Sequence, residues 1–123
     1  MTLFKISSVY LFIVGAGFLI APDVMMFGAL GAGISPFILS TLRGYGGVLI
    51  AVGTVNWMSQ NVGPSRARTS ITVGNLLGFG AVAVTGILGI LGGGPPLGWL
   101  FTAVNAGFAS AFYLHWKKAA PTA

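Results

Sequence analysis

Arg43 is the residue with the clearest capacity for chemistry, because it lies inside a long apolar stretch of the sequence. A guanidinium at the centre of a bilayer costs about 2.5–3.5 kcal/mol, and intramembrane charges are usually paired or functional. Two interpretations follow. The only carboxylate of the chain, Asp23, forms an ion pair with Arg43, or Arg43 binds an anion or a lipid headgroup. We favour the ion pair, because it needs no ligand.

The remaining residues offer little for catalysis. The chain has no cysteine and no glutamate, which excludes thiolate chemistry, disulfides and cysteine-based metal sites. His115 is the only histidine. It could ligate haem or a chlorin magnesium, but no second ligand accompanies it, so we interpret it as a residue of the membrane interface. We therefore expect no enzymatic activity, no metal and no cofactor.

The composition is that of an integral membrane protein. Of the 123 residues, 55% are hydrophobic and 6% charged, and the mean hydropathy is +0.93; an average soluble domain is roughly 25% charged. The net charge of +5 does not indicate nucleic-acid binding, because the basic residues form no stripe or aromatic-rich patch.

Four apolar stretches predict an all-α fold, a single membrane domain built as a four-helix bundle. The predicted spans cover residues 4–21, 36–58, 70–91 and 97–116, and a helix of 20 residues is about 30 Å long, the thickness of the hydrocarbon core. Pro36 suits the first turn of a helix, and the GGGPP segment from Gly92 ends the third span. The only plainly polar loop is SQNVGPSRART, residues 59–69.

The segment 23–35 has mixed character. It is too apolar for a free loop, with Met25 and Met26 adding apolar surface, and too rich in glycine for a regular helix. One interpretation is a short interfacial segment between the first two spans, a short helix or a re-entrant piece with Asp23 as a candidate N-cap. The other is an ordinary loop, and the sequence does not decide between them.

The basic residues predict the orientation. With four spans, all of them except Arg43 fall on one side of the membrane: Lys5, Arg66, Arg68, Lys117 and Lys118. Cytoplasmic loops carry the excess of lysine and arginine, so both termini are expected in the cytoplasm, in a bacterial inner membrane. Trp57 and Trp116 fall near the inner boundary and Trp99 near the outer one, as is usual for tryptophan.

Small residues on three predicted helices indicate close packing. In the second span, Gly46, Gly47 and Gly53 share a face with Arg43 and Trp57 at 100° per residue. This strip could pack against a helix or line a groove for an acyl chain, and packing is the commoner use. The third and fourth spans contribute further candidates for helix packing: Gly74, Gly78, Gly86, Ala103, Gly107 and Ala111.

Three asparagines fall within the spans: Asn56, Asn75 and Asn105. We expect them to form interhelical hydrogen bonds, each worth about 0.6 kcal/mol on average, which set the register of helices more than they stabilise them. The alternative is that these amides line a substrate path, but such paths usually also contain ionisable residues.

The layout resembles small uncharacterised bacterial four-span proteins related to the DoxX-like membrane families. The matching pieces are GAGFLIAPD, LRGYGGVLIAVGTVNWMSQ, GNLLGFG and LGWLFTAVNAGFASAFYL, which cover most of the chain. This resemblance implies a four-helix membrane bundle. It implies no chemistry and no catalytic residues.

Together these features predict a non-enzymatic function. The leading hypothesis is an accessory or scaffold subunit that associates with itself or with a larger membrane complex among the membrane lipids. The alternative is a binder or carrier of a lipid, a quinone or another hydrophobic small molecule, with Arg43, Asp23 and Trp57 as its site.

Overall fold

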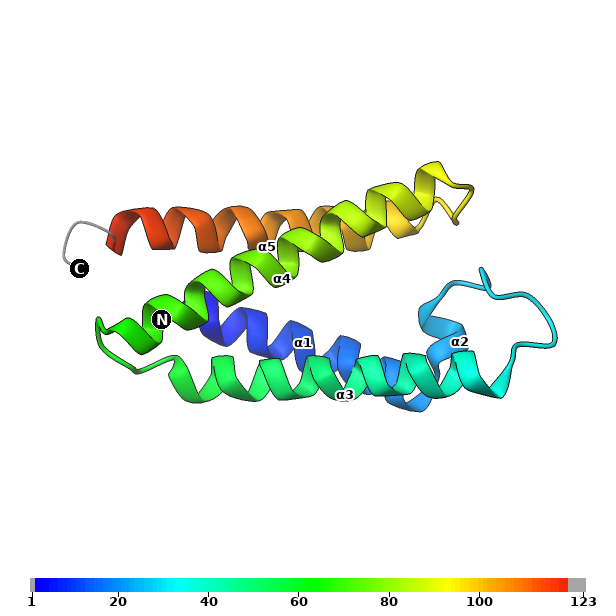
Figure 1. Cartoon of the computed structure of the whole chain (residues 1–123), viewed down its shortest axis with the longest axis horizontal. Coiled ribbons are helices and arrows are strands. Elements are labelled where there is room, and N and C mark those ends of the chain that lie inside the picture. Colours follow the sequence, from blue (N-terminus) through cyan, green and yellow to red (C-terminus); the bar gives the residue numbers. More distant parts are fainter. Residues whose placement is uncertain (1, 120–123) are drawn as a thin grey trace. The chain divides into compact units, whose positions relative to one another are not determined.

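The chain is all α-helical, with four long helices and one short helical piece after the first. The computed structural model describes residues 2–119. Its helices are α1 (Thr2–Ile20), α2 (Pro22–Met25), α3 (Pro36–Ser59), α4 (Arg66–Leu91) and α5 (Gly98–Ala119), shown in Figure 1. The prediction of an all-α protein with four long helices is confirmed.

Three of the described helices are long and apolar enough to cross a membrane: α1, α3 and α4. Helix α5 has 22 residues but is less apolar than these three. Its sequence includes Thr102, Asn105, Ser110 and His115, together with amphipathic tryptophans and a tyrosine. The prediction that this fourth helix also crosses the membrane therefore stays a prediction.

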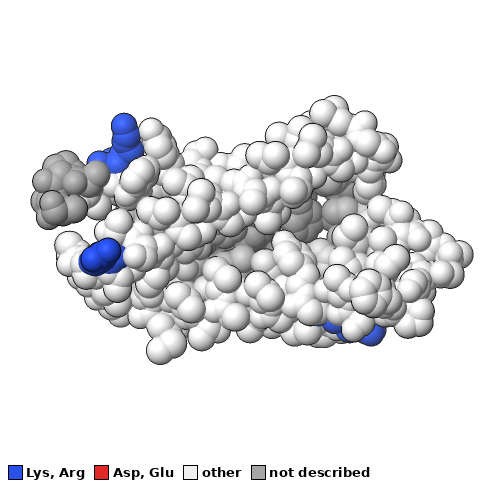
Figure 2. Space-filling view, in the orientation of Figure 1, with Lys and Arg blue, Asp and Glu red and all other residues white. Residues whose placement is uncertain are grey.

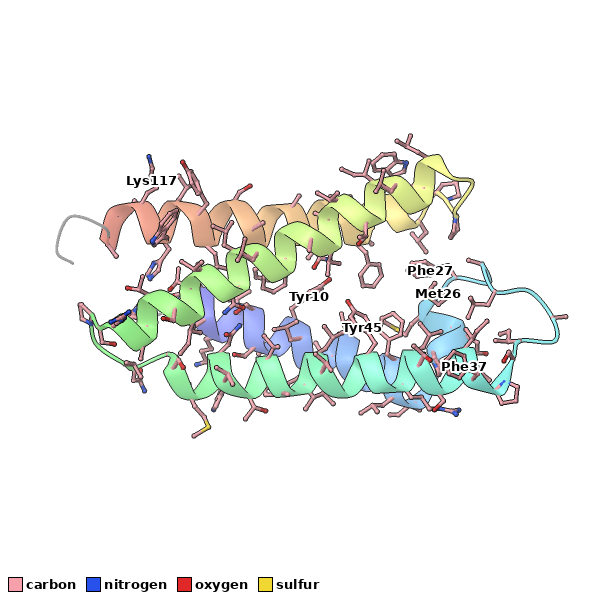
Figure 3. The ribbon with its side chains drawn as sticks, viewed as in Figure 1. Tyr10, Met26, Phe27, Phe37, Tyr45 and Lys117 are labelled. Carbon is pink, nitrogen blue, oxygen red and sulfur yellow. The ribbon has the colours of Figure 1, made fainter. Side chains whose placement is uncertain are left out.

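The helices form two compact units, Met1–Gln60 and Asn61–Ala123, here called unit 1 and unit 2. In unit 1, α1 and α3 pack side by side and antiparallel (Figure 1). Leu11 lies against Gly53, and Gly15 lies against Gly46. Residue numbers at the contact thus rise along α1 as they fall along α3, which is the antiparallel arrangement. Tyr45 on α3 (Figure 3) meets the ring of Phe18 edge-on, with 5.1 Å between the ring centroids.

The backbones of α1 and α3 approach closely because glycine lies on both sides of the contact. A Cβ atom on Gly46 would lie 2.6 Å from the carbonyl oxygen of Gly15 and 2.9 Å from the backbone nitrogen of Leu19. A Cβ atom on Gly15 would lie 2.8 Å from the carbonyl oxygen of Gly46. Neither position tolerates a side chain at this separation, so this glycine pair sets the distance between the two helices.

In unit 2, α4 and α5 form an antiparallel hairpin joined by a tight turn. Gly92 ends α4, and Gly93 has a φ of 99°, which favours glycine. Aromatic rings fill the contact between the helices: Phe79 stacks on Phe108 at 4.8 Å and on Phe112 at 5.9 Å between centroids.

The segment after α1 is helical for one turn only. Pro22 begins α2 and Ala21 precedes it without a capping side chain, so Asp23 lies in the first turn and the predicted cap at Asp23 is wrong. Residues 26–30 are turns and residues 31–35 are irregular. Positive φ angles bend the chain here, at Phe27, Gly28, Gly31 and Gly33. The expected short helix is confirmed for Pro22–Met25, and its location at a membrane interface stays a prediction.

The bounds of the long helices differ from the predicted spans mainly at α4, which begins at Arg66 and not at residue 70. The cause is Ser65, whose hydroxyl accepts a hydrogen bond from the backbone nitrogen of Arg68 at 3.2 Å and caps the helix. Both arginines of the predicted polar loop therefore lie in the first turn of a helix.

The glycine contact between α1 and α3 predicts different effects for two neighbouring substitutions. We expect Gly46→Ala to lower the free energy of unfolding by about 1–3 kcal/mol, because the new methyl group forces the helices apart. Gly47→Ala has open space around its Cβ position and is the matched control, with an expected change within about 0.5 kcal/mol. Unfolding of the purified protein in detergent, followed by circular dichroism, measures both. Equal losses would contradict the close contact.

Candidate functional site

A buried polar cluster lies in unit 1, near the N-terminal end of α1 and the C-terminal end of α3. The side-chain amide of Asn56 donates a hydrogen bond to the hydroxyl of Ser7 at 3.1 Å. The hydroxyls of Ser7 and Ser8 donate to the carbonyl oxygen of Phe4 at 3.0 and 2.7 Å. All four residues are fully buried. The cluster ties the two helices at a second point, and the expected interhelical bond of Asn56 is confirmed.

Trp57 lies beside this cluster and not beside Arg43. The ammonium of Lys5 lies 5.8 Å from the centroid of the Trp57 ring, within the range of a cation–π contact. Fourteen residues of helix separate Trp57 from Arg43, which corresponds to about 21 Å along α3. The structure therefore does not bring these two predicted site residues together.

Arg43 and Asp23 do not form the expected ion pair. Both side chains are exposed. Among residues 2–119, no carboxylate oxygen of Asp23 lies within ion-pairing distance of a guanidinium or an ammonium group. The favoured interpretation, in which Arg43 forms an ion pair with Asp23, is not what the structure shows. Arg43 remains an exposed cation on an apolar helix.

The predicted packing residues fall into two groups. Gly46 and Gly53 are buried against α1, and a Cβ atom on Gly86 would clash with the hydroxyl of Thr102 on α5. By contrast, nothing lies within 4 Å of the Cβ position of the others: Gly47, Gly74, Gly78 and Gly107. Of the two alanines predicted to pack, Ala103 is exposed and Ala111 is half-buried. The strip on α3 is thus divided, with α1 covering one edge of it.

The two asparagines of unit 2 are buried and donate hydrogen bonds within their own helices. Asn75 donates to the carbonyl oxygen of Ile71 at 2.9 Å, and Asn105 to that of Phe101 at 2.8 Å. Each of these bonds satisfies one N–H group of the amide. For Asn75 and Asn105, the expectation of an interhelical bond stays a prediction.

A basic cluster lies where the first turn of α4 meets the last turn of α5 in unit 2. Arg68 donates a hydrogen bond to the carbonyl oxygen of Val62 at 2.5 Å. Its second terminal nitrogen lies 3.3 Å from Nε2 of His115. A guanidinium has no lone pair to offer, so His115 accepts this bond in its neutral form with the proton on Nδ1. The ammonium of Lys117 lies 5.8 Å from the centroid of the Tyr113 ring.

Ser7, Ser8 and the partner of His115 were not predicted from the sequence. Two adjacent serines in an apolar helix are a usable pattern, because serine hydroxyls in such helices bond to carbonyls three or four residues earlier. The contact between Arg68 and His115 depends on α4 and α5 being antiparallel, and the short GGGPP turn implies that arrangement.

The described residues offer no cluster of metal-ligating side chains, and their charges are dispersed. Residues 2–119 contain no group of three or more His, Cys, Asp and Glu side chains that could hold a metal ion. Figure 2 shows lysine and arginine as separate blue patches with uncharged surface between them on the face drawn. Among the polar side chains, Asn56 and Ser7 join two helices. Except for Arg43, the basic residues offer positive charge near helix ends.

Comparison with known proteins found no match: no protein family, no curated protein and no solved structure is similar to this chain. The resemblance to DoxX-like membrane proteins stays a prediction, and the function has to be inferred from the chain itself.

The Asn56–Ser7 bond can be measured with a double-mutant cycle. We expect Asn56→Ala and Ser7→Ala to show a coupling energy of about 0.6 kcal/mol, with about 1.7 as the upper end for such bonds in membranes. Asn56→Ala with Thr54→Ala is the matched control, since the Thr54 hydroxyl donates within its own helix to Ile50. Its expected coupling is near zero in the same unfolding assay. Equal coupling in both cycles would show that the bond does not join the helices.

Proposed function

We propose that this chain is an integral membrane protein that acts as an accessory or scaffold subunit, in which α4 packs against a second copy or a larger membrane partner. The observation that carries this proposal is a strip of small residues along the exposed side of α4. Its members are Ser70, Gly74, Gly78, Ala81, Thr85 and Gly89, and all of them are exposed.

The geometry of this α4 strip suits a helix partner. Its residues recur every three or four positions and therefore lie within about 50° of a common line on the helix. Nothing within 4 Å would meet a Cβ atom on Gly74, Gly78 or Gly89. Small residues let two helix backbones approach closely, and van der Waals packing of this kind drives association in lipid.

The α4 strip has the same chemistry as the contact that already holds unit 1 together. There, Gly15 and Gly46 let the backbones of α1 and α3 meet. The glycines of the α4 strip would also let another backbone approach closely. No helix of unit 2 covers them, because α5 packs on the side of α4 that carries Phe79 and Gly86. An exposed copy of a packing surface supports a packing function.

Binding of a lipid, a quinone or a similar molecule is the alternative, and it now depends on Arg43 alone. Arg43 is exposed, and Gly44 and Gly47 beside it leave open space. Because Asp23 does not pair with Arg43, the guanidinium is available to an anion or a headgroup. Trp57 lies about 21 Å further along α3 and does not belong to the same site.

Association through α4 is tested by adding bulk to the strip. We expect Gly74→Leu with Gly78→Leu to abolish self-association or to release the partner, because two large side chains hold the helices apart. Val84→Leu is the matched control, since Val84 is exposed but lies about 90° round the helix from the centre of the strip. Energy transfer between labelled copies in vesicles, and gentle co-purification, report the outcome. A monomer with no partner in both assays would refute the proposal.

The proposed location is a bacterial inner membrane with both termini in the cytoplasm, which requires α5 to cross the bilayer. Because the chain has no cysteine, single cysteines report topology cleanly. We expect Gly63→Cys and Lys118→Cys to react only with a reagent on the cytoplasmic side, and Leu97→Cys only with one outside. Reaction of the Lys118→Cys variant from outside would show that α5 does not cross.

A further inference from the structure

The charges of unit 2 are all positive and all lie at one end. In residues 61–123 the sequence contains Arg66, Arg68, Lys117 and Lys118 and no acidic residue, since the only acid of the chain is Asp23. The arginines lie within the first three residues of α4, and the lysines lie in the last turn of α5. These four residues are here called the basic end.

The hairpin brings the two halves of the basic end together. The contact of 3.3 Å between Arg68 and Nε2 of His115 joins the start of α4 to the end of α5. The bond from Arg68 to the carbonyl oxygen of Val62 fixes the same guanidinium to the preceding loop. One cation is thus held in place, so less conformational entropy is lost when an anion binds beside it.

The other three cations, Arg66, Lys117 and Lys118, are exposed, and Figure 3 shows Lys117 pointing outward from the end of α5. Aromatic rings accompany them. Tyr113 lies under the ammonium of Lys117, and the rings of Tyr113 and Trp116 meet edge-on at 6.3 Å between centroids. Tryptophan and tyrosine collect at the level of the lipid headgroups, which places the basic end at the depth of the phosphates.

We propose that the basic end of unit 2 binds the phosphate groups of anionic phospholipids. Only positively charged side chains lie in unit 2, because it contains no Asp or Glu that would compete for these cations. A lysine or arginine near an anionic surface strengthens attraction by a factor of about five. This inference requires only that α4 lies in a bilayer. It does not require the chain to associate with itself or with a partner.

The test uses Trp116 as a reporter. The variant Trp57→Phe/Trp99→Phe leaves it as the only tryptophan. This protein is reconstituted in phosphatidylcholine vesicles containing brominated phosphatidylglycerol or, separately, brominated phosphatidylcholine. Bromine on an adjacent acyl chain quenches the fluorescence, so the two titrations give relative association constants. We expect phosphatidylglycerol to be preferred at least five-fold at low salt, and the preference to fall steeply in high salt. Equal quenching by both lipids, or a preference that salt does not change, would overturn the proposal.

Two sets of substitutions locate the preference. Arg66→Gln/Lys117→Gln/Lys118→Gln is expected to reduce it to near one, and Lys5→Gln/Arg43→Gln, which removes cations of unit 1, to leave it unchanged. Circular dichroism checks that each variant is helical. If the triple variant does not fold, the salt dependence measured with the unsubstituted basic end tests whether the preference for phosphatidylglycerol is electrostatic. An unchanged preference in a folded triple variant would refute the site.

Inorganic phosphate distinguishes a lipid site from a site for the free anion. Added at constant ionic strength in place of chloride, it is expected to leave the preference for phosphatidylglycerol unchanged, because a lipid is held by its acyl chains as well as by its headgroup. Specific displacement by inorganic phosphate would assign the basic end to a free anion and overturn the lipid proposal. The assay is run at high dilution in lipid, so failure of self-association does not affect its result.

Discussion

Most hydroxyl groups on the described helices donate to a carbonyl oxygen of the helix that carries them, and this constraint shapes the rest of the structure. Hydroxyls and amides along the helices donate to carbonyl oxygens three or four residues earlier, as Thr72, Thr85, Asn105 and Ser110 show. Among the described residues, no buried side-chain nitrogen or oxygen lacks a hydrogen-bond partner. Where a helix is surrounded by hydrocarbon, no water provides one. Contacts between the helices therefore depend largely on shape, which comes from Gly15 and Gly46 in unit 1 and from stacked phenylalanines in unit 2.

Glycine allows close contact between helices in two places. One is the contact between Gly15 and Gly46, and the other is the set of exposed glycines on α4. In unit 1 the small residues are covered, and the Asn56–Ser7 bond sets the register beside them. In unit 2 the contact between helices is built from stacked phenylalanines and from Gly86 against Thr102. That arrangement leaves the α4 strip exposed. The two units thus differ in how they use their small residues. In unit 1 these residues form the contact between the helices, and in unit 2 the α4 strip is not covered by α5.

Composition and periodicity predicted the helices well, because apolar stretches of bilayer length bounded by proline, glycine and polar residues leave few alternatives. The start of α4 was missed because the cap at Ser65 lies within a stretch that looks like a polar loop. The glycines were predicted as one packing set, but 100° of rotation per residue does not say which edge of a strip a neighbour covers. The Asp23–Arg43 pair was predicted only because both residues fall on the same side of the membrane. Two side chains at a similar depth in a membrane can still lie far apart within its plane. Arg68 and His115 needed a tertiary contact that only the hairpin provides.

The two arginines in the first turn of α4 have an electrical consequence for the whole hairpin. A helix dipole carries partial positive charge at its N-terminus. The charges of Arg66 and Arg68 add to this positive potential, and the dipole does not offset them. With the lysines of α5, one end of the hairpin carries four elementary charges and the other none. In a membrane whose interior is at negative voltage, moving that end to the outer side costs about 9 kcal/mol per 100 mV for four charges. For a hairpin inserted in such a membrane, the resting voltage therefore opposes the orientation with the basic end outside.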